Sequence, residues 1–327
     1  MSTIAIPLDD LYTPVATELA AVEQRFADEL FSELPFVNGL CDRVTRFRGK
    51  MLRPALVLLS GSAAGKVTSE HITLSAVVEM VHMATLVHDD VLDAADIRRR
   101  HATINSMNGN ETAVLLGDYL ISHAFHLCSG LSSQFASRLI GATTNTVCEG
   151  ELLQIHQRGN DQLSEEEYFE IIRRKTAALT ATCCTVGAKY ADADDELVER
   201  LTQFGMSAGV AFQIVDDVLD LIGTQREIGK TLGRDLDLGK PTLPIIHALA
   251  HGSSAARGEL SRLLRNGRAA SGVNVEQLLA ETDSVPYALQ TAERYTASAQ
   301  QQLSSLPASP ARDSLLAMSE FIVRRRA

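Results

Sequence analysis

The pentapeptide Asp-Asp-Val-Leu-Asp occurs twice in this chain, at residues 89–93 and again at residues 216–220. Each copy comes near the end of a long apolar stretch, residues 73–92 and residues 204–221, whose spacing is typical of a buried helix. Residues one and four positions apart lie close together around a helix, so each copy presents three carboxylates on one face. The repeat therefore predicts two core helices that each carry a carboxylate cluster.

The two carboxylate clusters predict a divalent metal site. A solvated acidic surface is the usual explanation for a run of Asp, but it does not fit helices that are apolar on nearly every side. Ionised carboxylates in an apolar setting are costly unless cations neutralise them. Oxygen ligands without nearby Cys or clustered His favour Mg²⁺, which shares its coordination sphere with water and substrate phosphates. The candidate ligands are Asp89, Asp90, Asp93, Asp216, Asp217 and Asp220.

Length and composition limit the class of protein. A chain of 327 residues with 45% hydrophobic content can bury a substantial core, and we expect one domain over residues 1–327 with a helical N-terminal extension at residues 1–30. The net charge of −11 argues against nucleic acid as a partner. Five cysteines without paired spacing indicate a reduced, cytoplasmic protein. The sequence contains no run of 18 consecutive apolar residues, so we expect no transmembrane segment.

The apolar spacing is helical almost throughout and predicts an all-α fold, a single-domain helical bundle with a central cavity. The predicted helices lie near residues 8–32, 36–47, 51–64, 70–93, 111–129, 132–158, 165–189, 193–223, 242–250, 254–267, 274–303 and 309–325. Two polar loops, residues 96–110 and 223–244, leave the ends of the acidic helices. If those helices face each other, both loops cover the mouth of one cavity.

Basic residues accompany the acidic helices. They comprise Lys50 and Arg53 at the start of an early helix, Arg98, Arg99 and Arg100 after the first motif, and Lys230, Arg234 and Lys240 after the second. Arg binds phosphate oxygens bidentately and Lys acts as a compact point charge, so the mixture suits a diphosphate. A solvated surface charge is the alternative for any single residue, but the grouping beside buried Asp clusters favours binding.

The motifs resemble those of trans-isoprenyl diphosphate synthases of the long-chain, polyprenyl type, from about residue 30 to the C-terminus. In the family's order they are GKMLRP (49–54), EMVHMATLVHDDVLDAADIRRR (79–100), GD (117–118), GE (150–151), KT (175–176), FQIVDDVLD (212–220) and GKTLGRDLDLGKPTLP (229–244). One departure is visible, because the family commonly has Gly where this chain has Arg100. The resemblance implies the isoprenoid synthase fold and a homodimer.

The resemblance implies successive prenyl transfer. An allylic diphosphate ionises, the double bond of isopentenyl diphosphate attacks the carbocation head to tail, and proton loss to the released diphosphate gives a longer allylic diphosphate. Three Mg²⁺ ions are expected, with Mn²⁺ able to substitute. Asp89, Asp93 and Asp216 would be direct ligands, and Asp90, Asp217 and Asp220 would bind directly or through water. No nucleophilic side chain is required, because neutralising the departing diphosphate is the main task.

Matching positions also imply the residues that bind substrate. Arg98, Lys175 and Lys240, with Lys230 assisting, would hold the allylic diphosphate. Lys50, Arg53, His82 and Arg99 would hold isopentenyl diphosphate. Thr176 would lie beside the carbocation, and Gln213 would contribute to the substrate pocket. A lone His on an apolar helix is more often a core residue, but its place in the motif favours substrate binding by His82.

The length of the product is expected to depend on the residues beneath the first Asp cluster. In short-chain relatives an aromatic side chain blocks the level four or five residues before the motif, where this chain has Thr85 and Ala84. Both are small, which predicts an open tunnel and an all-trans product of about C30–C45, with C40 favoured. A shorter farnesyl or geranylgeranyl product is the alternative.

Three other classes of protein are less consistent with the sequence. A class I terpene cyclase would normally have an Asn/Ser/Glu-type second motif in place of a second Asp-rich one. A di-iron bundle is suggested by Glu79 and His82, but that site needs two such ExxH motifs. A catalytically silent subunit of a prenyl synthase would have lost Asp or Lys from the motifs, and none is lost.

Overall fold

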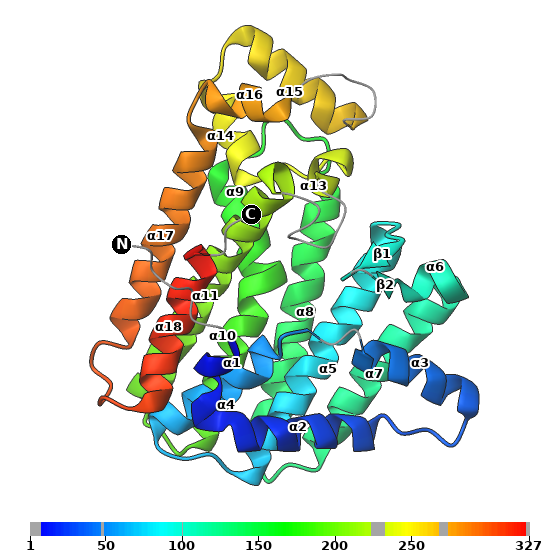
Figure 1. The fold of residues 1–327 in the computed structure, drawn as a ribbon, viewed down its shortest axis with the longest axis vertical. Coiled ribbons are helices and arrows are strands. Elements are labelled where there is room, and N and C mark those ends of the chain that lie inside the picture. Colours follow the sequence, from blue (N-terminus) through cyan, green and yellow to red (C-terminus); the bar gives the residue numbers. More distant parts are fainter. Residues whose placement is uncertain (1–7, 47–48, 100, 224–232, 268–273, 325–327) are drawn as a thin grey trace. The chain divides into compact units, whose positions relative to one another are not determined.

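The structure is a computed structural model that describes residues 8–46, 49–99, 101–223, 233–267 and 274–324, and its helices confirm the all-α prediction (Figure 1). The chain divides into two compact units. Unit 1 comprises Met1–Thr144, Leu179–Gly205 and Gln302–Met318, and unit 2 comprises Asn145–Ala178, Met206–Gln301 and Ser319–Ala327. That residues 1–327 act as a single synthase domain stays a prediction.

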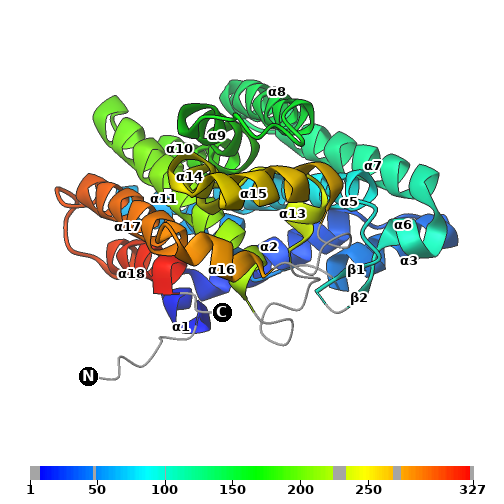
Figure 2. The same cartoon turned by 90° about the horizontal axis from the view of Figure 1, so that it is seen from above.

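Unit 1 is built around two long helices, α5 and α7, which run side by side (Figures 1 and 2). Its elements are α1 (Leu8–Leu11), the 3₁₀ turn η1 (Thr13–Val15), α2 (Ala16–Glu29), α3 (Pro35–Arg46), α4 (Leu52–Ala64), α5 (Ser69–Leu92), β1 (Ile97–Arg98), β2 (His101–Ala102), α6 (Ile104–Asn108), α7 (Asn110–Ser129) and parts of α8 (Phe135–His156), α10 (Ala178–Tyr190), α11 (Asp195–Ile222) and α18 (Pro310–Arg324). Phe26, Leu74 and Leu120 are fully buried in its core. The predicted N-terminal extension is helical where it is described.

The start of α5 is held by a histidine. The backbone N–H of Thr68 donates to His71 Nδ1 at 3.0 Å, so the other ring nitrogen carries the proton and donates to the carbonyl of Gly187 at 2.9 Å. A Cβ on Gly187 would lie 2.4 Å from the carbonyl oxygen of Val57, so only glycine lets α10 approach α4 this closely. These contacts fix one end of the helix that carries the first Asp motif at its other end.

The segment predicted as a polar loop at residues 96–110 contains regular structure. β1 and β2 form an antiparallel hairpin in which Ile97 pairs with Ala102, and α6 follows, capped where the Thr103 hydroxyl accepts from the Ser106 N–H at 3.3 Å. Strands of two residues are too short to show an alternating pattern, so the hydrophobic spacing cannot predict them.

Unit 2 carries the second motif on the C-terminal part of α11. Its other elements are the end of α8, α9 (Glu165–Ile172), the π turn η2 (Arg173–Ala177), α13 (Arg234–Asp237), α14 (Leu243–His251), α15 (Ser254–Asn266), α16 (Val275–Ala280), α17 (Ser284–Gln302) and the end of α18. α14 and α15 pack together (Figure 2). The helix predicted at residues 165–189 contains the π turn, and the one predicted at residues 274–303 breaks before Ser284, where Asp283 has φ 50°.

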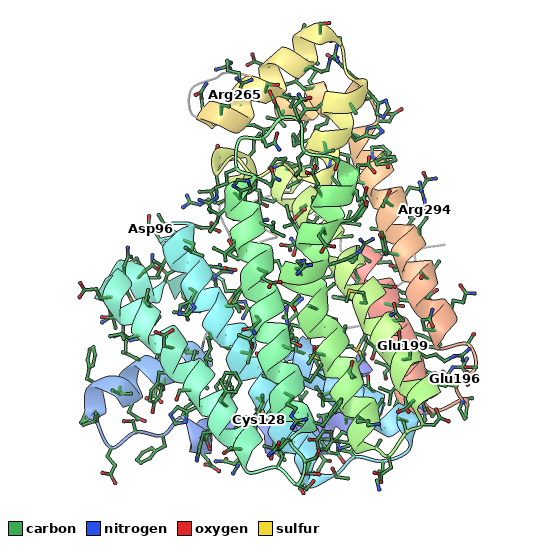
Figure 3. All side chains as sticks on the ribbon, turned by 180° about the vertical axis from the view of Figure 1, so that it is seen from behind. Asp96, Cys128, Glu196, Glu199, Arg265 and Arg294 are labelled. Carbon is green, nitrogen blue, oxygen red and sulfur yellow. The ribbon has the colours of Figure 1, made fainter. Side chains whose placement is uncertain are left out.

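No disulfide joins the five cysteines, all of which the structure describes. Cys41, Cys128, Cys183 and Cys184 are buried, and Cys148 is exposed. Burial raises the pKa of the Cys128 thiol, on α7 (Figure 3), to about 11, so it stays protonated and unreactive near neutral pH. Among the described residues, no helix is both long and apolar enough to cross a membrane.

Candidate active site

The first Asp motif lies at the C-terminal end of α5 in unit 1. Asp89 and Asp90 belong to the last turn, and Asp93 caps the helix, with its N–H donating to the carbonyl of Asp89 at 2.9 Å. The C-terminus of a helix carries partial negative charge, which disfavours carboxylates there, and neighbouring carboxylates repel one another. A bound cation would remove both penalties.

Arg98 and Asn105 hold Asp90 in place. Arg98 Nε donates to Asp90 Oδ1 at 2.6 Å, and the amide of Asn105 donates to the backbone carbonyl of Asp90 at 3.2 Å. Burial raises the pKa of Asp90, and the positive charge of Arg98 opposes that shift without cancelling it. The loop after the motif therefore folds back on the motif and positions one of its carboxylates.

A cluster of Arg53, His82 and Arg99 lies in the same unit. Burial lowers the pKa of His82 well below its ordinary value, and the neighbouring charges of Arg53 and Arg99 lower it further, so the imidazole is neutral at pH 7. Among the described residues, the buried Nε of Arg53 has no hydrogen-bond partner. Two guanidinium groups beside a neutral imidazole suit an anion and disfavour the di-iron alternative, which would place cations at His82.

Glu79 is a residue of this cluster that the sequence did not assign to substrate binding. It is buried on α5. Burial lowers the pKa of Arg53 and Arg99, and the negative charge of Glu79 opposes this shift in both. A Glu within a strongly apolar helix was the available signal, but its spacing from His82 suggested a metal motif instead.

Gly49 leaves room for the guanidinium of Arg99. A Cβ on Gly49 would lie 2.5 Å from Arg99 Nη2, closer than such atoms can approach. The next residue, Lys50, is exposed, and its carbonyl accepts a 2.8 Å hydrogen bond from the Tyr12 hydroxyl. The absence of a side chain at Gly49 therefore lets the guanidinium of Arg99 approach the backbone of the GKMLRP motif.

Three residues beside the first-unit motifs have left-handed backbone conformations without being glycine. Met51 has φ 51°, Ala94 has φ 47° and Arg99 has φ 50°. Such conformations cost of order 1–3 kcal/mol each, and they persist where the surrounding structure requires them, often at functional sites. They follow Lys50, Asp93 and Arg98 respectively, all candidate site residues.

In unit 2, Asp217 is a buried residue of the second motif that accepts two side-chain hydrogen bonds. The hydroxyl of Tyr168 donates to its Oδ2 at 2.7 Å and the amide of Gln213 to its Oδ1 at 2.7 Å. Burial, followed by the negative charge of Asp235, raises the pKa of Asp217 to about 8 despite these hydrogen bonds. Asp217 is therefore largely protonated at neutral pH when no cation is bound. Tyr168 and Asp235 were not identified from the sequence.

Asp235 also links the second motif to Lys240. Its N–H donates to Asp220 Oδ2 at 3.1 Å, and its carbonyl accepts from the N–H of Lys240 at 2.8 Å. Lys240 Nζ lies 3.8 Å from Asp235 Oδ1, and its side chain is almost fully buried. Asp216 is half-buried on the same helix. The predicted residue Lys230 lies outside the described residues.

The backbone before Lys240 requires glycine. Gly239 has φ 70°, and a Cβ there would lie 2.7 Å from the carbonyl oxygen of Leu264. Its own carbonyl accepts from the N–H of Gly159 at 2.7 Å. Nearby, Arg265 (Figure 3) pairs with Asp161 at 2.9 Å. The close approach of Gly239 to α15 and its hydrogen bond with Gly159 together set the backbone direction that buries the side chain of Lys240.

Lys175 belongs to the π turn, where α8 approaches very closely. A Cβ on Gly150 would lie 2.5 Å from the backbone nitrogen of Lys175. Lys175 forms an ion pair with Glu151 and donates to Gln154 Oε1 at 2.8 Å. Gly150 thus leaves space for the backbone of Lys175, and Glu151 supplies the negative charge that pairs with its ammonium group. This gives the GE motif a physical role that the sequence alone did not reveal. π turns are frequent at functional sites.

Thr176 is the start of a hydrogen-bond chain that ends at the second motif. Its hydroxyl donates to Gln213 Oε1 at 2.7 Å, and the amide of Gln213 donates to Asp217. The hydroxyl hydrogen of Thr176 is thus engaged by Gln213, which orients the oxygen of Thr176.

The two chain-length candidates differ in exposure. Ala84 is fully buried in the core of unit 1. Thr85 is half-buried, and its hydroxyl donates to the carbonyl of His82 at 2.8 Å. Thr85 precedes Asp89 by four residues and therefore lies on the same face of α5.

Each unit thus contains one carboxylate cluster with its own basic and polar residues. Unit 1 holds Asp89, Asp90, Asp93, Lys50, Arg53, His82, Arg98 and Arg99, and unit 2 holds Asp216, Asp217, Asp220, Lys175, Thr176, Gln213 and Lys240. The all-oxygen donor sets fit Mg²⁺. The raised pKa of buried Asp217 supports the same fit, because a cation would supply the charge that a proton otherwise supplies.

Comparisons with known proteins agree with the motifs. The polyprenyl synthetase family matches residues 35–282. Octaprenyl diphosphate synthase of Escherichia coli (strain K12) is 31% identical over 319 residues, which cover 97% of this chain and 99% of that one. All-trans-nonaprenyl-diphosphate synthase (geranyl-diphosphate specific) of Rhodobacter capsulatus is 35% identical over 321 residues, 97% of both chains.

A solved structure extends the similarity to the fold. The polyprenyl synthase of Caulobacter crescentus CB15, complexed with calcium and isoprenyl diphosphate, has a TM-score of 0.93 and 30% identity, with 99% of both chains covered. Family match, relatives and fold agree over nearly the whole length. The chain belongs to the polyprenyl synthetase family.

Proposed function

We propose that this protein is a Mg²⁺-dependent prenyltransferase that makes a long-chain all-trans polyprenyl diphosphate, about C30–C45 and most simply C40. The observation that carries the proposal is the pair of partly buried carboxylate clusters, each with basic residues in its own unit. The octaprenyl and nonaprenyl synthases among its relatives support a product in this range. Small residues at positions 84 and 85 support it independently.

The reaction proposed breaks the C1–O bond of the allylic diphosphate, and its bonding electrons leave with the diphosphate. The double bond of isopentenyl diphosphate forms a new C–C bond to C1 of the allylic group. The released diphosphate then removes a proton from C2 of the isopentenyl unit. Bound Mg²⁺ would neutralise charge on the leaving diphosphate. It would be held by Asp89, Asp90 and Asp93 in unit 1 and by Asp216, Asp217 and Asp220 in unit 2, with three ions expected.

In unit 1, Arg53, His82 and Arg99, with Lys50, would bind isopentenyl diphosphate. Arg53 offers a buried Nε for which the described residues supply no acceptor. The neutral His82 can donate one hydrogen bond without adding charge. Glu79 would balance the guanidinium charges before the anion arrives. This role makes Glu79 a positioning residue.

Arg98, Lys175 and Lys240, with Lys230 assisting, would bind the allylic diphosphate, as the family motifs imply. Lys175 and Lys240 are already paired with Glu151 and Asp235, which hold their side chains in place. Thr176 would direct its lone pairs towards the carbocation, because Gln213 engages its hydroxyl hydrogen. Gln213 would thereby orient both Thr176 and Asp217.

Replacing Gly49 by Ala is expected to raise the KM for isopentenyl diphosphate about tenfold, because the new methyl group displaces the guanidinium of Arg99 and weakens a charge-assisted hydrogen bond. The KM for the allylic diphosphate, kcat and the melting temperature should change little. Steady-state kinetics with each substrate varied separately would measure this. Gly39→Ala is the matched control, since a Cβ there meets nothing within 4 Å. An unchanged KM in Gly49→Ala would remove Arg99 from this binding site.

The proposed function is tested by incubating purified protein with Mg²⁺, labelled isopentenyl diphosphate and farnesyl or geranyl diphosphate, then measuring product length after dephosphorylation. A ladder that ends near C40 supports both the reaction and the open tunnel. Products of C15–C20 keep the reaction but indicate the shorter-chain alternative. Cyclic hydrocarbon released without consumption of isopentenyl diphosphate indicates a terpene cyclase. No product with either primer indicates a silent subunit.

We also propose that the protein is a homodimer. Helix α7 exposes Val114, Leu115 and Phe125, and Leu115 is 67% exposed. Leu115→Asp is expected to shift the mass in light scattering from two chains to one, because a charge on this face would oppose burial. Phe36→Asp, on α3 and 64% exposed, is the control. A wild-type mass of one chain at micromolar concentration would contradict the proposal.

A further inference from the structure

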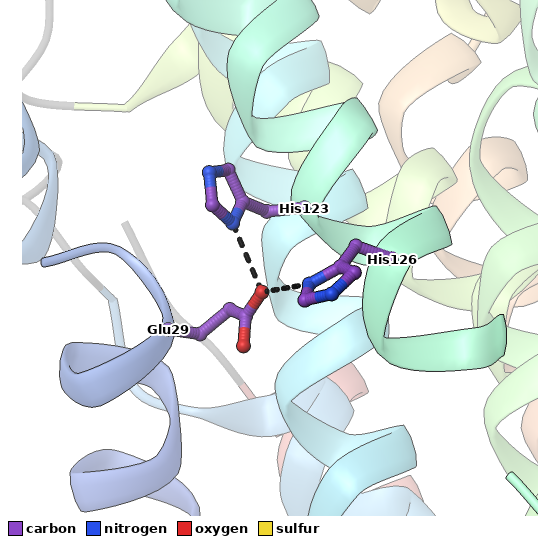
Figure 4. A group of neighbouring side chains, drawn as sticks. All are labelled: Glu29, His123 and His126. Atoms are coloured by element: carbon purple, nitrogen blue, oxygen red, sulfur yellow. Dashed lines mark hydrogen bonds and ion pairs between the residues drawn. The ribbon is translucent and has the colours of Figure 1, made fainter. Parts of the chain in front are cut away.

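Glu29, His123 and His126 form a cluster in unit 1 that the proposed reaction does not use (Figure 4). Glu29 is the last residue of α2, and the two histidines lie three residues apart on α7, hence on one face of that helix. His123 Nδ1 lies 3.0 Å and His126 Nδ1 lies 2.7 Å from the same oxygen, Glu29 Oε1. All three potential ligand atoms lie within 4.8 Å of one another.

The carboxylate of Glu29 lies in an environment that calls for a compensating positive charge. Its side chain is only 11% exposed. It also ends a helix, where the partial negative charge of the helix C-terminus disfavours an anion. The imidazoles of His123 and His126 both hydrogen-bond to this carboxylate and therefore stabilise it.

The two imidazole rings differ in how they are packed. The ring of His123 is partly buried and packs edge-on against Tyr119, with ring centroids 4.4 Å apart. In a single chain the side chain of His126 is 74% exposed. One ligand from α2 and two from α7 would tie the N-terminal helix to a central helix of unit 1.

The donor set differs in kind from that of the Asp motifs. Two imidazole nitrogens with one carboxylate oxygen are typical of Zn²⁺ sites that keep a fourth position for water, whereas Mg²⁺ prefers oxygen ligands alone. Metal–ligand bonds of about 2.0–2.2 Å place tetrahedral ligands about 3.3–3.5 Å apart. The two nitrogen–oxygen distances, 3.0 and 2.7 Å, would have to lengthen by roughly 0.3–0.8 Å, which small rotations of the three side chains supply.

We propose that Glu29, His123 and His126 bind one divalent transition-metal ion, with Zn²⁺ favoured, at a site separate from the Asp motifs. On binding, each ring takes the tautomer that carries its proton on Nε2, and any further proton is released to solvent, so both rings bind the ion as neutral ligands through Nδ1. Binding links α2 to α7 and stabilises unit 1. The inference does not rest on prenyl transfer, so either can fail without the other.

Chelator-treated full-length protein, titrated with Co²⁺ as a spectroscopic substitute for Zn²⁺, tests the site. One equivalent of Co²⁺ should produce visible d–d bands typical of imidazole ligation, and Zn²⁺ should abolish them by displacement. Zn²⁺ should also raise the melting temperature of the wild-type protein in excess Mg²⁺. His123→Ala and His126→Ala should each weaken Co²⁺ binding at least about tenfold.

Control variants separate the site from the rest of the molecule. Glu29→Gln keeps an oxygen that accepts from both imidazoles, so the variant should fold like the wild type. Because the carboxylate charge is gone, it should nevertheless bind Co²⁺ less tightly than the wild type. His156→Ala, an exposed histidine on α8, and Asp217→Asn should both retain the bands and the Zn²⁺ stabilisation. Bands that survive in the His123→Ala/His126→Ala double variant, bands lost in Asp217→Asn, or no binding to the wild-type protein would each overturn the proposal.

Discussion

Asp217→Asn is expected to lower prenyl transfer about 100- to 1,000-fold and, in metal-free protein at pH 7, to raise the melting temperature. The loss follows because one carboxylate that would stabilise the departing diphosphate through Mg²⁺ is gone. The gain follows because burial and Asp235 make the charged form of Asp217 unfavourable. Asn can still accept from Gln213 and donate to the oxygen of Tyr168. Calorimetry with and without Mg²⁺, beside a turnover assay, measures both effects.

The contribution of Asp217 to the free energy of unfolding depends on pH, and its sign explains why Asp217→Asn should stabilise the metal-free protein. Below pH 3.8, the ordinary pKa, Asp217 is protonated in both the folded and the unfolded protein. As the pH rises towards 8, the unfolded chain releases this proton while the folded protein retains it, because the folded pKa is about 8. The unfolded state then binds fewer protons, so this residue lowers the free energy of unfolding progressively across that window. The loss levels off above pH 8.

Asp217→Asn should remove this contribution, so its stabilising effect should be near zero at pH 4 and largest near pH 8, in metal-free protein. A gain of about 1 kcal/mol would correspond to a shift of about 1–2 °C in a protein of 327 residues. Added Mg²⁺ should stabilise the wild type more than the variant. Asp42→Asn, an exposed residue of α3, serves as control. A variant that is destabilised equally at pH 4 and pH 8 would refute the electrostatic explanation.

Thr85→Phe is expected to shorten the main product from about C40 to C15–C20 while the rate of the first condensation changes little. Thr85 lies one helical turn before Asp89 and is half-buried, so a ring there would extend beneath the end of α5 that carries the first Asp motif. The hydrocarbon that grows away from the diphosphate would meet that ring after one or two additions. Chromatography of dephosphorylated products measures the change.

Ala84→Phe should also shorten the product, but at a cost in stability. Ala84 is fully buried, so the larger ring would overpack the core by about 1–3 kcal/mol. Thr85→Val, which keeps the volume and removes only the hydroxyl bonded to the His82 carbonyl, should leave product length unchanged. If Thr85→Phe still yields the full-length product, the growing chain does not pass this part of α5.

The sequence predicted the helices that carry the motifs because their signal is local. Apolar residues recur around the whole of α5 and α11, and the structure ends these helices at Leu92 and Ile222, one residue before the predicted ends. The π turn within the predicted 165–189 helix was not foreseeable in this way. It coincides with the close approach of Gly150 to Lys175, a tertiary contact between residues 25 positions apart that helical periodicity does not encode.

The residues of the candidate site also divide into those with a local sequence signal and those whose role depends on tertiary contacts. Asp and Lys residues within named motifs could be identified because the motif itself carries the chemistry. Tyr168 was not found, because its role depends on a hydrogen bond to Asp217, 49 residues further along the chain. Asp235 was missed although it lies in a named motif, since its effect on Asp217 and Lys240 is visible only in the folded loop.

The left-handed conformations of Met51, Ala94 and Arg99 have a consequence for evolution and engineering. Glycine would adopt these angles without steric cost, so variants chosen for thermal resistance alone would accumulate glycine at all three positions. Glycine would also let the backbone leave these angles, which would loosen the loops beside Lys50, Asp93 and Arg98. Libraries selected for heat tolerance and libraries selected for turnover should therefore diverge at these residues first.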